Sequence, residues 1–311
     1  MKKGKFNNIL PNYICDVLNT VRFAPSPTGF LHEGHLLSAL YVWAAALKWG
    51  LKIHLRIEDH DQSRARPAYI AGIREDLAWL GFHYDSESIQ SARSAIYEAA
   101  LQKLQAKSLV YPCFCSRKQL QEENPRSETG EIIYQGKCFY RHEPPAMSHE
   151  VGPHNLRFIV PDRTIDWHDL RLGDFHENPK LQCGDFPIRD RDNQWTYQFA
   201  VCVDDIDEHI THIVRGEDIR NSTARQIALM EALGRTERPV YLHHPLIVDE
   251  NNKKLSKREL AHSLRQDKEA GITPETLFGR VCHKAHLTET EAPLSLQEAI
   301  ALVAGTLPDK F

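Results

Sequence analysis

The chain reads RFAPSPTGFLHEGH from Arg22 to His35, and the surroundings of this segment point to an α/β fold. Before it, residues 16–23 alternate towards apolar side chains as in a strand, and the turn-rich APSPTG then ends that strand. After it, apolar residues recur at helical spacing as far as Leu47. A strand that leads through a loop into a helix is the first unit of a parallel sheet.

The same strand and helix pattern repeats along the chain. Residues 52–57 alternate as a second strand, and residues 70–80 carry apolar side chains at helical spacing. Further elements are predicted later: strands at 197–203, 210–214 and 240–248, and a helix at 222–233. The expected fold is an α/β domain with a parallel sheet.

The pattern breaks between Tyr111 and Asp185, where prolines, cysteines and polar turns gather around short extended pieces such as residues 155–160. We therefore expect an inserted subdomain that splits one α/β domain. The predicted parts are a leader at 1–15, the first half of the α/β domain at 16–110, the insertion at 111–185, the second half with a lysine-rich loop at 186–258, and a short helical C-terminal appendage at 259–311.

Composition narrows the class of protein. With 41% apolar and 26% charged residues, the chain has the makeup of a folded globular protein. The apolar run from Leu36 to Leu47 is shorter than the roughly 18 to 20 residues that span a bilayer, so we expect no membrane segment. Asn7, Asn8 and Pro11 interrupt the basic start, which argues against a signal peptide and for a cytoplasmic protein.

Charge and cysteine content add two expectations. The net charge of −4, from 38 basic and 42 acidic residues, is not that of a general nucleic-acid coat protein, so any RNA contact would be local. Seven cysteines are an odd number, which favours reduced thiols and metal binding over a disulfide framework. We expect a monomer.

The loop before the first predicted helix has the composition of a phosphate site. A helix N-terminus offers free N–H groups and partial positive charge, and Gly34 lets a ligand approach the backbone. The imidazoles of His32 and His35 add donors. Taken alone, each histidine is more often a cap in a proline-rich turn than a phosphate ligand. A metal pair is the other alternative, although no third ligand is obvious nearby.

A second segment, KKLSKR from Lys253 to Arg258, follows the predicted strand at 240–248. Lysines on such a loop can close over a triphosphate and neutralise the charge that develops as pyrophosphate leaves. On its own, the segment is more typical of an ordinary basic surface loop.

Together the two segments resemble the two signatures of class I aminoacyl-tRNA synthetases. RIEDHD at 56–61 and IVRGED at 213–218 are similar to the glutamyl branch of that family, as is the run from Arg22 to Gly29. The resemblance covers most of the chain, from about Val21 to Arg258. It implies a Rossmann-like class I catalytic domain that a zinc-containing insertion splits.

Length distinguishes the members of this branch. Glutamyl- and glutaminyl-tRNA synthetases carry large anticodon-binding domains after the lysine loop, whereas 53 residues (311 minus 258) follow Arg258 here. The chain therefore resembles most the short members, which attach glutamate to the modified base queuosine in the anticodon of tRNA(Asp). The implied partners are ATP, L-glutamate and the queuosine-bearing anticodon stem-loop of tRNA(Asp).

The resemblance also implies residue roles. Arg22 and Arg215 would hold carboxylate oxygens of glutamate, Glu58 its α-ammonium group, and Tyr197 would donate its hydroxyl. The remaining residues of the glutamate-binding loop are Phe23, Ala24, Pro25 and Ser26. Outside the family context, a structural ion pair between Arg22 and Glu58 and a core role for Tyr197 are the alternatives.

The nucleotide site follows in the same way. His32 and His35 would contact the phosphates and Lys257 would stabilise the departing pyrophosphate, with Mg²⁺ sharing its charge. The residues implied for ATP are His32, Gly34, His35, Lys254, Leu255, Ser256, Lys257 and Arg258.

The insertion contains a candidate metal site. Cys113, Cys115 and Cys138 offer three thiolates, which suit tetrahedral Zn²⁺ with one further ligand. Spacing favours His142 as that ligand, because Cys138-x3-His142 is an ordinary zinc half-site. Family resemblance favours Tyr134 instead, and we adopt Tyr134 with His142 as the rival. Reduced cysteines in a small core are the third reading.

The expected activity has two steps: ATP-dependent, tRNA-independent conversion of glutamate to glutamyl-adenylate, and transfer of glutamate to queuosine. Two alternatives remain open. One is a truncated glutamyl-tRNA synthetase that charges the tRNA 3′ end, and the other is a noncatalytic zinc-containing tRNA-binding module.

Overall fold

The computed structural model describes residues 19–140, 153–247 and 262–309. The strands in these residues are β1 (Thr20–Phe23), β2 (Lys52–Ile57), β3 (Ser86–Ile89), β4 (Val110–Cys113), β5 (Asn155–Phe158), β6 (Ile165–Asp169), β7 (Gly173–Glu177), β8 (Pro187–Arg189), β9 (His212–Gly216) and β10 (Val240–His244). A seven-stranded sheet has the order β3-β2-β1-β9-β10-β6-β7, and its neighbouring strands are parallel except in the β6–β7 hairpin. A smaller antiparallel sheet has the order β4-β5-β8. The α/β fold class predicted from the sequence is confirmed.

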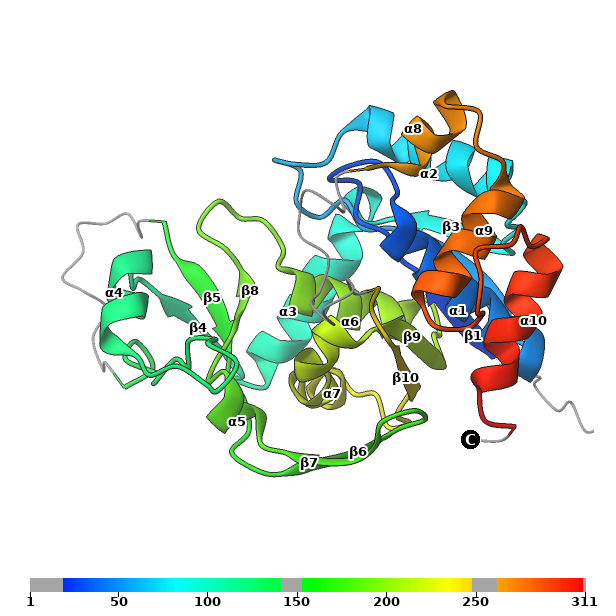
Figure 1. Ribbon diagram of the computed structural model, residues 1–311. Helices are drawn as coiled ribbons and strands as arrows, with labels where there is room; N and C mark the ends of the chain where they lie inside the picture. Colours follow the sequence, from blue (N-terminus) through cyan, green and yellow to red (C-terminus); the bar gives the residue numbers. More distant parts are fainter. Residues whose placement is uncertain (1–18, 141–152, 248–261, 310–311) are drawn as a thin grey trace, which may run out of the picture.

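Helices cover both faces of the large sheet (Figure 1). They are α1 (Glu33–Trp49), α2 (Pro67–Leu80), α3 (Ser94–Ala106), α4 (Arg117–Glu123), α5 (Pro179–Gln182), α6 (Tyr197–Asp207), α7 (Thr223–Ala232), α8 (Leu264–Glu269), α9 (Pro274–Lys284) and α10 (Leu296–Thr306), with short 3-10 helices at Gln90–Ala92 (η1) and Glu217–Ser222 (η2). Successive residues of β9 show the two faces: Val214 joins the core beneath α1, α9 and α10, whereas Ile213 joins the core beneath α3, α6 and α7. Alternation along a strand explains this division, because successive side chains point to opposite faces.

The strand order indicates where on the sheet a ligand would bind. From β1 the chain proceeds through β2 and β3 on one side, and β9 and β10 lie on the other side. The order therefore reverses between β1 and β9. Ligands of open α/β sheets bind beyond the carboxyl ends of the strands at such a reversal. The loops after β1 and β9 are then the candidate site.

The predicted strand at 197–203 is wrong, because these residues begin helix α6. The run YQFAVCV contains aromatic and β-branched residues, but a short apolar run is compatible with a strand or with a buried helix. Every residue from Phe199 to Asp205 is buried, so the run from 197 to 203 lacks the regularly spaced polar residues that would mark a helix.

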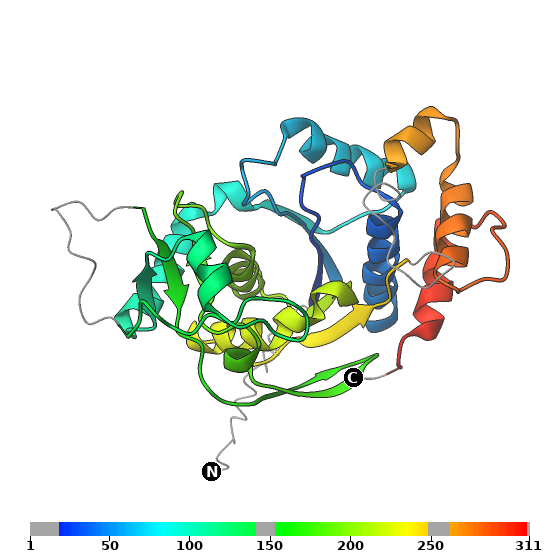
Figure 2. The same ribbon diagram turned by 60° about the vertical axis from the view of Figure 1, so that its left-hand side comes forward.

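Part of the predicted insertion joins the large sheet. Strand β6 pairs in parallel with β10, and the β6–β7 hairpin extends the sheet at that edge, as Figure 2 shows. The small sheet lies on the far side of the molecule from α9 and α10 (Figure 1). Within the described residues, no helix is long and apolar enough to cross a membrane. The predicted leader, residues 1–15, lies outside the described residues.

Candidate active site

A cavity of about 600 Å³ opens where the loops after β1 and β9 meet the start of α1. It is lined by every residue predicted to bind glutamate: Arg22, Phe23, Ala24, Pro25, Ser26, Glu58, Tyr197 and Arg215. The predicted nucleotide residues His32, Gly34 and His35 also line it. Side chains separated by almost 200 residues in the sequence thus share one cavity.

His32 and His35 form the cap of helix α1. The backbone N–H of Gly34 donates to Nδ1 of His32 (3.1 Å), and the backbone N–H of His32 donates to Nδ1 of His35 (3.2 Å). Burial lowers the pKa of both rings, to about 3 for His35, so both are neutral at physiological pH. Because each Nδ1 accepts, the ring proton of each must be on Nε2. Two neutral N–H donors therefore accompany the helix N-terminus.

Glu58 is buried beside an arginine pair. Its Oε1 lies 3.7 Å from Nη1 of Arg56, and neither of these atoms has a hydrogen-bond partner among the described residues. Burial raises the pKa of Glu58 to about 7, although Arg56 and Arg22 oppose the shift. The carboxyl is therefore partly protonated near neutral pH and would gain from a cationic ligand.

Arg22 and Arg56 are held by shared carboxylates. Nε of Arg22 donates to Asp205 (3.1 Å) and its Nη1 to the carbonyl of Val214 (3.1 Å). Nη2 of Arg56 donates to the same Asp205 oxygen (2.6 Å). Although burial alone would raise it, the two arginines keep the pKa of Asp205 below its usual value. Arg22 and Glu58 are not in a direct ion pair in the structure: Arg22 pairs with Asp205.

Arg215 differs from Arg22 because its partners are neutral. Its Nε donates to Nε2 of His243 (3.0 Å), Nη1 to Oε1 of Gln226 (2.6 Å) and Nη2 to the hydroxyl of Thr223 (2.9 Å). The residue is 5% exposed, and no described carboxylate forms an ion pair with it. Its positive charge is thus available to an anionic ligand in the cavity.

The cavity also has lining residues to which the sequence analysis assigned no role. They are Thr28, Ser38, Val214, Gly216, Asp218, Ile219, His244, Leu246 and Ile247. The segment 213–218 contains three of them, so its resemblance to the family was the available signal. Leu246 and Ile247 follow β10 at the same sheet edge and give the cavity an apolar wall.

A second hollow of about 530 Å³ is also lined by the histidine pair. It shares Ser26, Thr28, His32 and His35 with the first cavity. Ser263 and Arg265, which follow the predicted lysine loop in the sequence, also line it. The predicted ATP-binding residues Lys254, Leu255, Ser256, Lys257 and Arg258 lie outside the described residues.

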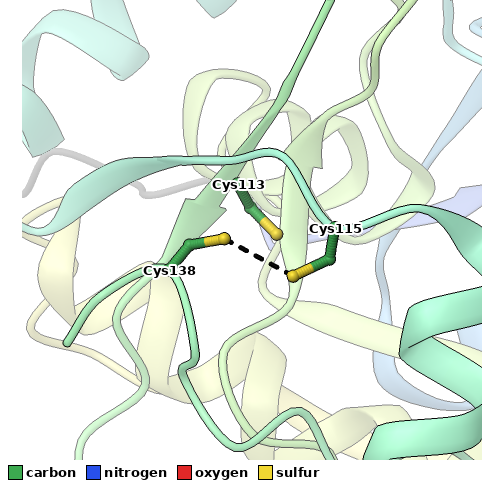
Figure 3. A group of neighbouring side chains, drawn as sticks. All are labelled: Cys113, Cys115 and Cys138. Atoms are coloured by element: carbon green, nitrogen blue, oxygen red, sulfur yellow. Dashed lines mark hydrogen bonds between the residues drawn. The ribbon is translucent and has the colours of Figure 1, made fainter. Parts of the chain in front are cut away.

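Three cysteine sulfurs converge at one end of the small sheet. The Sγ atoms of Cys113, Cys115 and Cys138 lie within 4.8 Å of one another, and Figure 3 shows them pointing inward. Sulfur ligands about 2.3 Å from a tetrahedral zinc would be roughly 3.8 Å apart. The observed separation of 3.4 Å between Cys115 and Cys138 is close to that value. The cluster can hold a metal ion.

The Tyr134 hydroxyl lies next to this cluster. Its oxygen is 3.5 Å from Sγ of Cys113 and 3.7 Å from Sγ of Cys115, and it accepts the backbone N–H of Cys138 at 2.9 Å. The Arg157 guanidinium covers the tyrosine ring at 3.9 Å from its centroid. The rival ligand, His142, lies outside the described residues.

The fold and the cavity match a known family. Residues 19–301 match the family described as tRNA synthetases class I (E and Q), catalytic domain. The chain therefore belongs to the class I tRNA synthetases of this type, which are ligases. The resemblance predicted from the two signatures is confirmed.

Individual relatives fall into two groups. The chain is 38% identical over 278 residues to the glutamyl-Q tRNA(Asp) synthetase of Neisseria gonorrhoeae, covering 89% of this chain and 92% of that protein. It is 40% identical over 268 residues to the glutamate–tRNA ligase of Aquifex aeolicus, covering 84% of this chain and 56% of that protein.

A solved structure agrees with this family assignment. The crystal structure of a glutamate tRNA ligase from Elizabethkingia meningosepticum, in complex with its amino acid, matches with a TM-score of 0.75 and 29% identity. The match covers 91% of this chain and 64% of that one, so this chain spans about two thirds of the ligase.

Proposed function

We propose that this protein activates L-glutamate with ATP to glutamyl-adenylate without tRNA, and then transfers the glutamate to queuosine in the anticodon of tRNA(Asp). The observation that supports the first step, the activation of glutamate, is the arrangement of charged side chains in the cavity of about 600 Å³. Two buried guanidinium groups, of Arg22 and Arg215, and the carboxyl group of Glu58 line the same space. Glutamate offers two carboxylates and one ammonium group, so its charges complement these three side chains.

The individual contacts support this assignment. Among the described residues, Arg215 has only neutral hydrogen-bond partners, so a substrate carboxylate would supply its missing counter-ion. Oε1 of Glu58 lacks a hydrogen-bond partner, so an ammonium group would satisfy a buried acceptor. Tyr197 lines the same cavity and would donate its hydroxyl to the substrate.

The nucleotide would lie on the histidine side of the cavity. The α-carboxylate of glutamate would attack the α-phosphate of ATP, and pyrophosphate would leave. The Nε2–H groups of His32 and His35 would donate to phosphate oxygens, together with the N-terminus of α1. We assign Lys257 and the adjoining loop residues 254–258 to the departing pyrophosphate. Mg²⁺ bound with ATP would share the phosphate charge.

The acceptor is inferred from the relatives. The match to the Neisseria gonorrhoeae protein named glutamyl-Q tRNA(Asp) synthetase covers 92% of that protein. Identity to a glutamate–tRNA ligase is of the same size, 40%, so charging of the tRNA 3′ end is the second candidate. Both candidates use the same glutamate and ATP sites and differ in the acceptor.

We assign the cysteine cluster to one structural Zn²⁺ with Tyr134 as the fourth ligand. Three soft thiolate donors favour zinc over hard cations, and the phenol oxygen lies close to two of the sulfurs. When bound, the ion would cross-link the end of β4 and the loop after it, which hold Cys113 and Cys115, to the segment around Cys138.

The test is glutamate-dependent exchange between ATP and pyrophosphate with purified protein and Mg²⁺, without tRNA. Robust exchange with glutamate, and none with aspartate or glutamine, is the expected result. Exchange that requires tRNA would favour the glutamate–tRNA ligase reading. The absence of exchange under both conditions would favour a noncatalytic tRNA-binding module.

A further inference from the structure

His243 and Asp169 form a buried pair behind Arg215 that the proposed chemistry leaves unexplained. His243 lies on β10 opposite Arg215 on β9, in direct register between parallel strands. Asp169 ends β6, on the other side of β10. Both His243 and Asp169 are completely buried. The side chains form a row across three neighbouring strands that ends at the cavity.

The hydrogen bonds along this row determine where the imidazole proton lies. Nδ1 of His243 is 2.7 Å from Oδ2 of Asp169, and Nε of Arg215 donates to Nε2 of the same ring (3.0 Å). An arginine can only donate, so Nε2 must accept and the ring proton must be on Nδ1, from where it is donated to Asp169. Burial lowers the pKa of His243, which keeps the ring neutral as this pattern requires.

Asp169 is held firmly enough to fix this tautomer. Its Oδ1 accepts the backbone N–H groups of Arg171 (3.0 Å) and Leu172 (2.9 Å) in the hairpin turn. Its Oδ2 accepts the backbone N–H of His243 (3.0 Å) as well as the ring proton. These donors lower the pKa of Asp169 although burial opposes them, so the carboxylate stays ionised.

The neutral imidazole has a consequence for the charge of Arg215. A guanidinium has five N–H groups, and His243, Gln226 and Thr223 accept three of them. Two N–H groups remain for a ligand. Because all three protein acceptors are neutral, they orient the guanidinium without neutralising it. A carboxylate at the position of His243 would orient it equally well but would compete with a substrate carboxylate.

We infer that His243, with its tautomer fixed by Asp169, is a positioning residue that aims the Arg215 guanidinium at a carboxylate of the bound amino acid. This inference rests on the proposed function, since it names glutamate as the ligand. The competing explanation is that the pair only anchors the β6–β7 hairpin to β10.

Two substitutions at one position separate these explanations. In His243→Gln, the amide oxygen reaches the position of Nε2 and can still accept from Arg215. In His243→Asn, the shorter amide can still donate to Asp169 but ends before Nε2, so Arg215 loses its acceptor. Positioning depends on the bond to Arg215, which His243→Gln keeps. Hairpin anchoring depends on the bond to Asp169, which His243→Asn keeps.

The measurements are calorimetric binding of L-glutamate, and KM for glutamate and for ATP in pyrophosphate exchange, using the full chain. We expect His243→Asn to weaken glutamate binding and raise its KM at least tenfold, with KM for ATP within twofold. We expect His243→Gln to stay within about threefold of the unmodified protein. Melting temperatures of both variants serve as the folding control.

Other results would overturn the inference. Glutamate affinity of His243→Asn within twofold of the unmodified protein would do so, as would equal losses for glutamate and ATP. A larger loss in His243→Gln than in His243→Asn would favour hairpin anchoring. Glutamate binding by the unmodified protein without any exchange would refute the proposed function alone, whereas no glutamate binding would refute both.

Discussion

Replacement of Arg215 by glutamine tests the charge arrangement of the cavity. The residue is 5% exposed, its three protein partners are neutral, and two N–H groups remain for a ligand. A hydrogen bond to a charged group contributes about 1.5–3 kcal/mol, so two bonds to a carboxylate contribute roughly 3–6 kcal/mol. At about 1.4 kcal/mol for each factor of ten, kcat/KM for glutamate should fall by roughly two to four orders of magnitude.

The assay is pyrophosphate exchange at varied glutamate and saturating ATP. The matched control is Arg220→Gln, because Arg220 follows in η2, pairs with Glu177 and does not line the cavity. We expect this control to stay within about threefold of the unmodified protein. If Arg215→Gln kept kcat/KM within threefold as well, Arg215 would not be the carboxylate receptor and the charge argument would fail.

Three further predictions concern pH, metal and packing. Because the pKa of Glu58 is raised to about 7, its carboxyl becomes neutral as the pH falls below that value, and KM for glutamate should rise. In Glu58→Gln, initial rates measured between pH 6 and 8 should no longer show this pH dependence of KM. Cys113→Ser should lose most of the metal found by elemental analysis of the purified protein, and unchanged metal content would contradict the assigned site. A Cβ at Gly279 would lie 2.1 Å from the carbonyl oxygen of Ala292. Overpacking of this kind costs about 1–3 kcal/mol, so Gly279→Ala should lower the melting temperature by several degrees. In the control, Gly305→Ala on α10, the added Cβ meets no neighbour within 4 Å, so the melting temperature should not fall.

The sequence was most informative where function depends on a continuous segment. The sequence around the segment from Arg22 to His35 predicts that it joins a strand to a helix, and the structure has β1 and α1 there. This position brings the side chains of the segment to the carboxyl ends of the strands. Arg215 is a sequence-predicted site residue because it lies in a recognisable segment, which the structure places at the end of strand β9. These residues gather in one cavity because the carboxyl ends of parallel strands meet at one edge.

The sequence was least informative where a role depends on tertiary contacts. Helix α6 was mistaken for a strand because burial on nearly all sides removes the polar stripe of an amphipathic helix. The pairing of β6 with β10 was not predicted either. Consequently the bond between Asp169 and His243, 74 residues apart, could not be foreseen, although a histidine pair within an apolar strand was a signal that polar contacts exist there.

The acceptor of glutamate is the central claim, and one labelling experiment tests it most directly. Radiolabelled glutamate, ATP and Mg²⁺ would be incubated with the protein and tRNA(Asp), either containing queuosine or lacking it, and the tRNA would then be cut by nuclease and its fragments separated. We predict label on the anticodon fragment, and only when queuosine is present. Label on the 3′-terminal adenosine, independent of queuosine, would contradict the account and identify a glutamate–tRNA ligase activity instead.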